Sequence, residues 1–225
     1  ESHQEFFTTQ AHTVLLGAIA QATNKIKIAS SSSIISTSDP VRVFEDFATL
    51  DLISDGRAEI IAGGASRLGL FELLGYDVQD YEALFEEKFE LLLELNQKEL
   101  INWTGEFRAP LNNAEILPRP KNGSLPIWRA VGGGPGSAIR AGMQGVPMFI
   151  ATLGGPAESF QYSIEVYREA LSRSGHLPKE FPVATAGWFY TAETTQQAFQ
   201  EIYPHVDEGM KRTNGQGFPK QQFAQ

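Results

Sequence analysis

The chain has 225 residues, of which 42% are hydrophobic, so it can bury a substantial core in one or two domains. Its net charge of −9 and the lack of a basic run argue against nucleic acid as a partner. The absence of cysteine excludes disulfides, thiolate metal sites and a cysteine nucleophile, and fits a reducing, cytoplasmic location. No apolar run approaches the roughly 20 residues of a membrane span, and no signal peptide opens the chain.

The first half of the chain alternates helices with short strands. Apolar residues at helical spacing predict helices, and apolar runs that end in Ser or Gly predict strands. The helices are expected over Thr8–Thr23, Val41–Ile53 and Asp80–Asn96, and the strands over Lys25–Ser33 and Ala58–Ala62. Leu100–Leu125, which is rich in Pro, Asn and Gly, is expected to be an irregular insertion.

The second half continues the same alternation. We expect strands over Ile127–Val131, Met148–Thr152 and Phe181–Thr191, helices over Ser137–Gly145, Ala157–Arg173 and Thr194–Tyr203, and a loop over Pro204–Gln225. Strands that alternate with helices predict a parallel sheet, open or closed. Ligands of such folds bind at the carboxyl ends of the strands, where this chain has loops rich in Gly, Ser and Thr.

The glycine-rich segment after Val131 is the strongest candidate for a binding loop. Gly132, Gly133, Gly134 and Gly136 precede Ser137, which we expect to cap a helix that Gly145 ends. Free N–H groups, a hydroxyl and the helix dipole at one point favour a phosphate. The alternative is a strand–helix turn that binds nothing. The glycine spacing matches neither the dinucleotide fingerprint nor a Walker loop, and the pattern of a nucleophile elbow is absent.

The run from Asp39 to Arg67 resembles a signature of the bacterial luciferase-like flavin monooxygenase family. In that family a Pro-hydrophobic-Arg opens a helix that carries Leu-Asp, and Ser-x-Gly-Arg leads into the next strand. The matching residues here are Pro40-Val41-Arg42, Leu50-Asp51 and Ser54-Asp55-Gly56-Arg57. The preceding helix, the segment Lys25-Ile26-Lys27-Ile28 and the segment from Pro118 to Gly145 follow in the family's order, so the resemblance covers nearly the whole chain.

The resemblance implies a (β/α)₈ TIM barrel of the luciferase-like type, usually paired as a homodimer. A complete barrel takes roughly 250 residues or more. We therefore expect residues 1–225 to form a single barrel domain, incomplete at both ends, with the insertion around residues 100–125. The first residue, Glu1, is not a methionine, which also indicates a piece of a longer protein.

The resemblance also implies the position of a flavin. Gly132–Ser137 match the loop that holds the flavin phosphate, and Gly63, directly after the strand Ala58–Ala62, is a further cofactor-binding candidate. Arg67, just after that strand, is the candidate charged partner. Arg67 could instead pair with an acid such as Glu72. Ser31 and Ser32 match the strand end where members carry a non-proline cis peptide beneath the isoalloxazine ring. The alternative there is a hydroxyl-rich strand end that bonds to its own loop.

The candidate catalytic residue is His3. Glu1-Ser2-His3 lies where the family often shows Glu-His-His, so His3 matches the second histidine and Ser2 replaces the first. An imidazole at this place could move protons, although a structural or solvent-facing role is the alternative. The first histidine is the one tied to chemistry in luciferases, so Ser2 argues against luciferase-like aldehyde oxidation. We expect no metal site, and expect Glu86 and Glu87 to lie on a solvated helix face.

The function implied by the resemblance is a flavin-dependent oxidoreductase. The first hypothesis is a monooxygenase that uses reduced FMN and O₂ on an organic small-molecule substrate, with a separate flavin reductase as a partner. The second is hydride transfer with the deazaflavin F420. Two further hypotheses are a non-catalytic flavin-binding protein and a barrel enzyme that acts on phosphorylated metabolites. No segment of the sequence identifies the substrate.

Overall fold

The computed structural model describes residues 10–65, 69–132, 134–152, 157–187 and 190–220. The chain divides into two units, one of residues Glu1–Ile150 with Tyr162–Ala184 and one of residues Ala151–Gln161 with Thr185–Gln225. That the chain is a single barrel domain therefore stays a prediction. Within the described residues, none of the helices combines the length and the apolarity that crossing a membrane would require.

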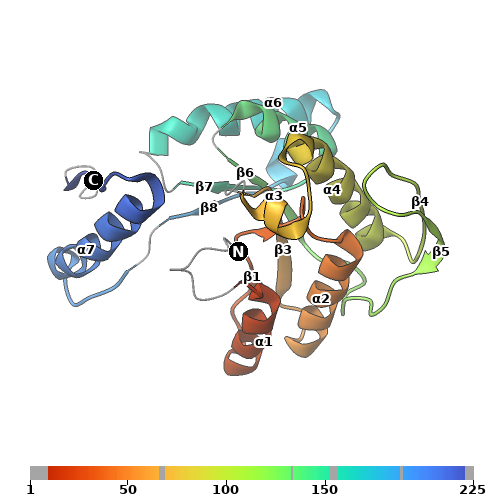
Figure 1. Cartoon of the computed structure of the whole chain (residues 1–225), viewed down its shortest axis with the longest axis horizontal. Coiled ribbons are helices and arrows are strands. Elements are labelled where there is room, and N and C mark those ends of the chain that lie inside the picture. The colour runs from red at the N-terminus through yellow and green to blue at the C-terminus, as the bar shows by residue number, and fades with distance from the viewer. Residues whose placement is uncertain (1–9, 66–68, 133, 153–156, 188–189, 221–225) are drawn as a thin grey trace. The chain divides into compact units, whose positions relative to one another are not determined.

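The sheet is built from strands that follow chain order. Its strands are arranged β1-β3-β6-β7-β8, with β2 also paired to β3, and every pair whose register is defined runs parallel. The strands are β1 Ile28–Ala29, β2 Ser33–Ile34, β3 Ala58–Gly63, β6 Ile127–Val131, β7 Met148–Ala151 and β8 Val183–Ala186. The sheet is curled (Figure 1), and helices connect its strands, as in part of a (β/α) barrel. This confirms the expected barrel type.

Amphipathic helices cover the outer side of this sheet. They are α1 His12–Ala22, α2 Pro40–Ile53, α3 Gly69–Leu74, α4 Tyr81–Gln97, α5 Pro135–Gln144 and α6 Gln161–Arg173, with short 3₁₀ turns at Val78–Asp80, Ala157–Phe160 and Pro178–Glu180. Helix α2 starts as expected, because Asp39 accepts a hydrogen bond from the N–H of Val41 at 2.8 Å and Pro40 occupies the first helical position. The main hydrophobic cluster contains the fully buried Phe44, Phe47 and Phe89, and a second, smaller cluster surrounds Leu70 and Phe71.

Two polar residues of the signature segment hold the fold together. Buried Arg57 donates to the carbonyl oxygens of Ala20 at 2.8 Å and Ile26 at 3.0 Å, which ties β3 to the segment between α1 and β1. Buried Asp51 accepts from the N–H groups of Ala58 at 3.3 Å and Lys121 at 2.9 Å. Both therefore satisfy backbone groups that burial would otherwise leave unpaired.

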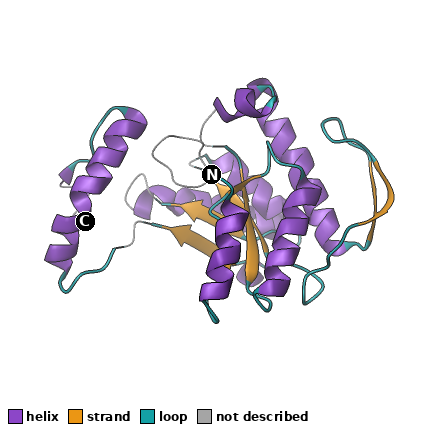
Figure 2. Ribbon diagram, turned by 60° about the horizontal axis from the view of Figure 1, so that its bottom comes forward, coloured by secondary structure: helices purple, strands orange, loops and turns teal. Residues whose placement is uncertain are grey.

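Three sequence expectations are corrected by the structure. The predicted strand over residues 25–33 is interrupted, and only β1 and β2 pair with β3. The insertion contains an antiparallel pair, β4 Leu100–Trp103 and β5 Leu111–Glu115, which extends away from the parallel sheet (Figure 2). Alternation is weak in β5 because its residues are exposed or only partly buried, so neither face of that strand has to be apolar.

The third correction concerns the predicted loop after Tyr203. Helix α7 runs from Thr195 to Asn214 and includes Pro204. Ion pairs one turn apart, Asp207 with Lys211 and Glu208 with Arg212, support the helix beyond the proline. The loop was expected because the segment after Tyr203 carries glycines and glutamines, but α7 contains Gly209 and ends only at Asn214, before Gly215.

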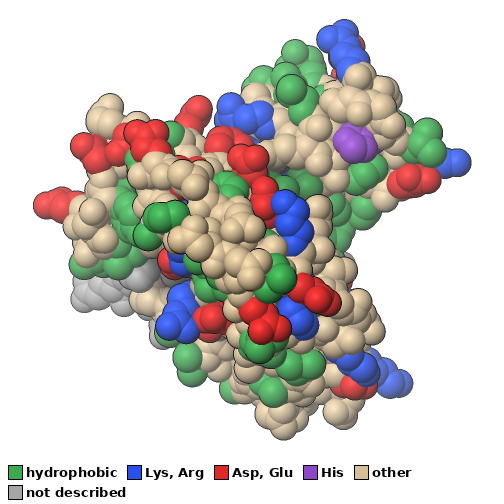
Figure 3. All heavy atoms as spheres, turned by 90° about the vertical axis from the view of Figure 1, so that its right-hand side faces the viewer, with side chains coloured by type: hydrophobic (Ala, Val, Ile, Leu, Met, Phe, Trp, Pro, Cys, Tyr) green, Lys and Arg blue, Asp and Glu red, His purple; other side chains and the backbone are tan. Residues whose placement is uncertain are grey.

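The surface carries charges of both signs. On the face drawn in Figure 3, acidic and basic side chains are interspersed. Ion pairs at the surface, such as Arg42 with Glu45 and Arg173 with Glu169, contribute little to stability.

Candidate functional site

The residues from Ser30 to Ser33, here called the serine segment, run from the carboxyl end of β1 to the start of β2. They lie beside the carboxyl ends of β3 and β6, so the predicted cofactor residues meet at one end of the sheet. Ile34 pairs with Gly63 across β2 and β3, and Ala62 pairs with Arg129 across β3 and β6. Parallel register therefore places the serine segment, Gly63 and the glycine loop after Val131 on neighbouring strand ends. These three pieces lie 30 or more residues apart in the sequence.

The serine segment packs directly against Gly63. The Ser31–Ser32 peptide bond is cis, which confirms the expectation for this strand end. A Cβ on Gly63 would lie 2.8 Å from Cβ of Ser32 and 3.1 Å from Cβ of Ala130, so only glycine leaves room for the Ser32 side chain. Ser31 is exposed and Ser32 half-buried. The segment thus presents a small, uncharged surface, although a cofactor contact of Ser31, Ser32 or Gly63 stays a prediction.

A chain of side-chain hydrogen bonds holds the serine segment from the helix side. Nε2 of His12 lies 3.0 Å from Oγ of Ser33, and Oγ of Ser33 lies 2.7 Å from Oγ of Ser30. Ser30 and Ser33 are buried, and they flank the Ser31–Ser32 peptide on both sides. Sequence reasoning left His12 without a role, because nothing in a helix-period pattern reveals that its ring reaches a strand 21 residues away.

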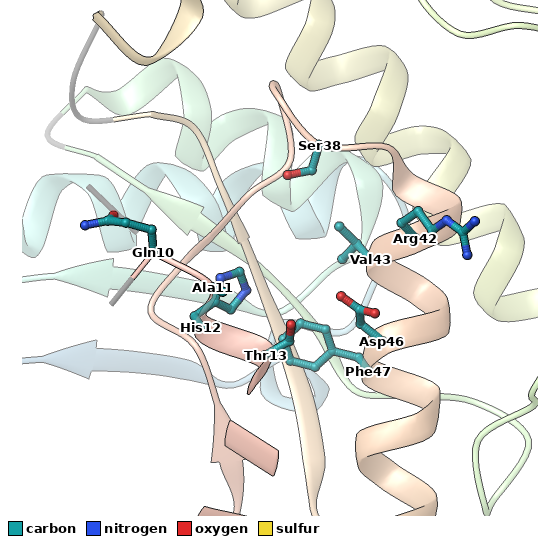
Figure 4. Close-up of a pocket in the computed structure, with 9 residues that line it drawn as sticks. All are labelled: Gln10, Ala11, His12, Thr13, Ser38, Arg42, Val43, Asp46 and Phe47. Atoms are coloured by element: carbon teal, nitrogen blue, oxygen red, sulfur yellow. The ribbon is translucent and has the colours of Figure 1, made fainter. Parts of the chain in front are cut away.

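A cavity of about 190 Å³ lies beside this hydrogen-bond chain, between the first turns of α1 and α2. Figure 4 shows Asp46 and Val43 of α2 pointing into the space next to His12, whereas the guanidinium of Arg42 points away. Gln10, Ala11, Thr13, Ser38 and Phe47 complete its wall. The acidic side chain of Asp46 and the imidazole of His12 therefore both line this cavity, on the strand-end side of the two helices.

The loop after β2 is also anchored by a buried cation. Lys88 of α4 is 2% exposed, its Nζ donates to the carbonyl oxygen of Ser36 at 2.7 Å, and it lies 4.1 Å from the ring centre of Tyr76. Burial lowers the pKa of Lys88 to about 8, while the charges of Asp39 and Glu87 act in the opposite direction.

Glu87, next to Lys88 in α4, does not lie on a solvated face as expected. Its carboxylate accepts hydrogen bonds from the backbone N–H groups of Glu106, Phe107 and Arg108.

The glycine loop leads into α5, but its cap differs from the expectation. Gly134 is the N-cap and Pro135 the first helical residue, so Ser137 lies in the first turn and does not cap the helix. Proline disfavours helical backbone geometry in the residue that precedes it, so the helix begins at Pro135 and Gly134 stays outside it. Gly145 ends the helix in the left-handed conformation, with φ of 62°, as expected.

The glycines of this loop are not required by the packing of the described residues. A Cβ built on Gly132, Gly134 or Gly136 would meet nothing within 4 Å, and none of the three has a positive φ. The N–H groups of Gly136 and Ser137 precede the first residue that can donate within the helix, so they are free to bind a ligand. The loop therefore forms an open cradle with unused donors, which suits an anion such as a phosphate.

Behind this cradle lies a buried arginine that sequence reasoning missed. Arg129 of β6 is 1% exposed, and it donates to Oε2 of Glu86 at 2.9 Å and to Oε1 of Gln144 at 2.8 Å. Its Nε lies 3.5 Å from Oγ of Ser137. Glu86 is thus partly buried and paired, which corrects the expectation of a solvated face. The available signal was an arginine within an otherwise apolar strand.

Three of the predicted site residues, His3, Arg67 and Gly133, lie outside the described residues. Their roles as catalyst, charged partner and loop member stay predictions. Among the residues that the structure describes, no group of three or more His, Asp or Glu side chains is placed to hold a metal ion.

Comparison with known proteins identifies the family. The model of the luciferase-like monooxygenase family matches residues 1–225. An F420-dependent glucose-6-phosphate dehydrogenase from Amycolatopsis mediterranei is 29% identical over 143 residues, which are 61% of this chain and 41% of that protein.

Solved structures share the fold. The monooxygenase RslO1 from Streptomyces bottropensis superposes with a TM-score of 0.79 at 26% identity, over 89% of this chain and 60% of that one. The oxygenating constituent of 3,6-diketocamphane monooxygenase from Pseudomonas putida, in complex with FMN, has a TM-score of 0.76 at 17% identity, over 95% and 63% of the two chains.

The chain spans about half the length of the curated relatives that it matches, with 48%, 41% and 54% for three of them. The family match nevertheless covers the whole of this chain, and the parallel strands and the strand-end residues agree with it. The chain belongs to the luciferase-like monooxygenase family, whose members include monooxygenases and F420-dependent dehydrogenases and are enzymes.

Proposed function

We propose that the protein is a flavin-dependent monooxygenase that binds reduced FMN and uses O₂ to oxidise an organic substrate. The observation that carries this proposal is the loop of Gly132, Gly134 and Gly136, where a Cβ would meet nothing within 4 Å among the described residues. The N–H groups of Gly136 and Ser137 also precede the first donor within the helix. The FMN complex of the structurally similar P. putida protein supports the choice of cofactor. Reduced flavin would come from a separate reductase.

The described residues fit such a cofactor at both of its ends. The N–H groups of Gly136 and Ser137 and the Ser137 hydroxyl would donate to the phosphate. Ser31 and Ser32, held against Gly63, would form a small neutral wall along the ring. The bound flavin supplies the redox chemistry with O₂, whereas the protein positions the flavin and excludes water. His3 is proposed to move protons.

The alternative within the family is hydride transfer with F420. The A. mediterranei relative, which is an F420-dependent dehydrogenase, is the observation that supports this alternative.

We also propose that the protein forms a homodimer. The apolar side chains of Val14 and Leu15 on α1, which are 75% and 47% exposed, support this proposal.

The test is a fluorescence titration of the intact, cofactor-stripped protein with FMN and with F420. We expect saturable FMN binding, and a Ser137→Asp variant should bind FMN at least tenfold more weakly because a carboxylate repels the phosphate. Ser172→Asp, on the exposed side of α6, adds the same charge away from the loop and should bind normally.

The same titration separates the alternatives. A preference for F420 would move the protein to the hydride-transfer class. Tight FMN binding with slow oxidation by O₂ and no turnover of any substrate would indicate a non-catalytic flavin-binding protein. Binding of neither cofactor by the folded protein would refute the proposal, and unchanged affinity in Ser137→Asp would refute the position of the phosphate.

A further inference from the structure

The side chain of Arg129 lies between β6, α4 and α5 and touches both ends of α5. It contacts Gln144, the last residue of the helix, and Ser137 in its first turn. Its guanidinium also lies 4.7 Å from the ring centre of Phe85, on α4. A buried guanidinium with these partners fixes the helix on the strand through several directed contacts. The first turn of α5 is therefore held in place by a charged group.

A second arginine shares the same carboxylate. Nε of Arg140, on α5, lies 2.9 Å from Oε1 of Glu86, and that oxygen also accepts from Arg129. Two guanidinium groups thus share one carboxylate. Glu82 lies 3.9 Å from Arg140, but its side chain is 76% exposed, so water and salt screen its charge. Arg129, Arg140 and Glu86 together carry one net positive charge; Arg129 is fully buried, whereas the side chains of Glu86 and Arg140 are 32% and 41% exposed.

This positive charge lies next to Ser137, at the end of the glycine loop. Arg140 follows Ser137 by three residues, so the two side chains lie on the same face of α5. The Nε–H of Arg129 is directed at Oγ of Ser137, over a long distance of 3.5 Å. A hydroxyl that accepts from an arginine must direct its own hydrogen elsewhere. Ser137 is thereby left to donate toward the open side of the loop.

We propose that Arg129 and Arg140, joined by Glu86, act as positioning residues for the phosphate end of the cofactor. They hold the first turn of α5, orient the Ser137 hydroxyl and supply positive potential beneath the glycine loop. The inference rests on the proposed function, since it deepens the assignment of the phosphate to this loop. It assigns the compensating charge to the helix side of β6, whereas the sequence suggested only Arg67 after β3.

The experiment compares ligands with and without a phosphate. FMN and riboflavin share one ring system, so the ratio of their dissociation constants isolates the contribution of the phosphate. For a deazaflavin, F420 is compared with the same chromophore without its phosphate-linked side chain. We measure these ratios for the intact protein and for Arg140→Gln, Arg140→Lys and Arg129→Lys, after thermal melting has shown that each variant is folded.

The matched control is Arg173→Gln on α6. Arg173 is also a helix arginine paired with one glutamate, and its side chain is 78% exposed, so the control loses the same charge away from the loop. Arg140→Gln should bind FMN roughly tenfold more weakly with riboflavin affinity unchanged, and the loss should shrink at high salt. Arg140→Lys should keep most of the affinity, whereas Arg129→Lys should weaken FMN selectively because lysine lacks the Nε–H directed at Ser137.

The outcomes are distinguishable. If the wild type prefers FMN to riboflavin but Arg140→Gln and Arg129→Lys match the control, the inference is wrong while the proposed function stands. If the variants weaken FMN and riboflavin equally, the arginines are merely structural and the inference also fails. If the wild type binds neither FMN nor F420, the proposed function and this inference fail together.

Discussion

The two ends of the candidate site are held in place by different physical means. At the serine segment, an imidazole and hydroxyl groups make the contacts: His12, Ser33 and Ser30 form a hydrogen-bond chain, and Ser32 fills the space that Gly63 leaves. At the glycine loop, a buried cluster of Arg129, Glu86 and Arg140 holds the helix.

This difference matches what each end is proposed to bind. A flat ring needs shape and small side chains, and a charge beneath it would have to be desolvated. A phosphate carries charge of its own, so positive potential nearby repays that cost. The glycines differ in the same way, because Gly63 is crowded by protein atoms whereas Gly132 faces open space.

The largest expected effect comes from breaking the charged cluster. Glu86→Gln removes the carboxylate that faces buried Arg129 and should lower the free energy of unfolding by about 3 kcal/mol, as measured by urea denaturation. Glu90→Gln, on the exposed face of the same helix, should change it by less than about 0.5 kcal/mol. Equal effects of the two variants would mean that the cluster does not stabilise the charged end.

The second largest expected effect is a difference in stability between substitutions at Gly63 and at Gly132. Gly63→Ala should destabilise the protein by about 2 kcal/mol, because its Cβ would overlap Ser32 and approach Ala130. Gly132→Ala should leave stability within about 0.5 kcal/mol, since its Cβ meets nothing, but should weaken FMN binding. Thermal unfolding and flavin titration of the two variants check this contrast, and a reversed order of stability would contradict it.

The smallest effect concerns pH. Lys88, which anchors the loop after β2, has a pKa lowered to about 8 by burial, whereas arginine stays charged throughout the accessible range. Between pH 8 and about 10.5 the unfolded chain keeps the Lys88 proton that the folded protein releases. Raising the pH therefore favours the folded state, and below pH 8 the contribution is constant.

Lys88→Met isolates this contribution. The stability of the wild type relative to Lys88→Met should rise by about 1 kcal/mol between pH 8 and 9, as measured by urea denaturation at each pH. Glu86→Gln should show no comparable trend relative to the wild type, because its partner does not titrate there. A constant difference between wild type and Lys88→Met would show that Lys88 titrates normally.

The fold class and the positions of the strand-end loops could be predicted from the amino-acid sequence alone. Helical and strand periodicities are local properties, so α2, α4, β3 and β6 could be placed from apolar spacing and turn residues alone. The resemblance added the cis peptide at Ser31–Ser32 and the family, both of which are confirmed. The glycine loop was likewise found from composition, although Pro135 rather than Ser137 set the start of its helix.

Which side chains come into contact could be seen only in the folded protein. Arg129 and Glu86 are 43 residues apart, and His12 and Ser33 are 21 apart, so no local pattern connects them. Glu86 and Glu87 fall on the polar face of a helical wheel, yet neighbouring elements cover that face and pair both carboxylates. Whether a polar residue is solvated or buried depends on what packs against it, and periodicity within one element contains no information about the neighbouring elements.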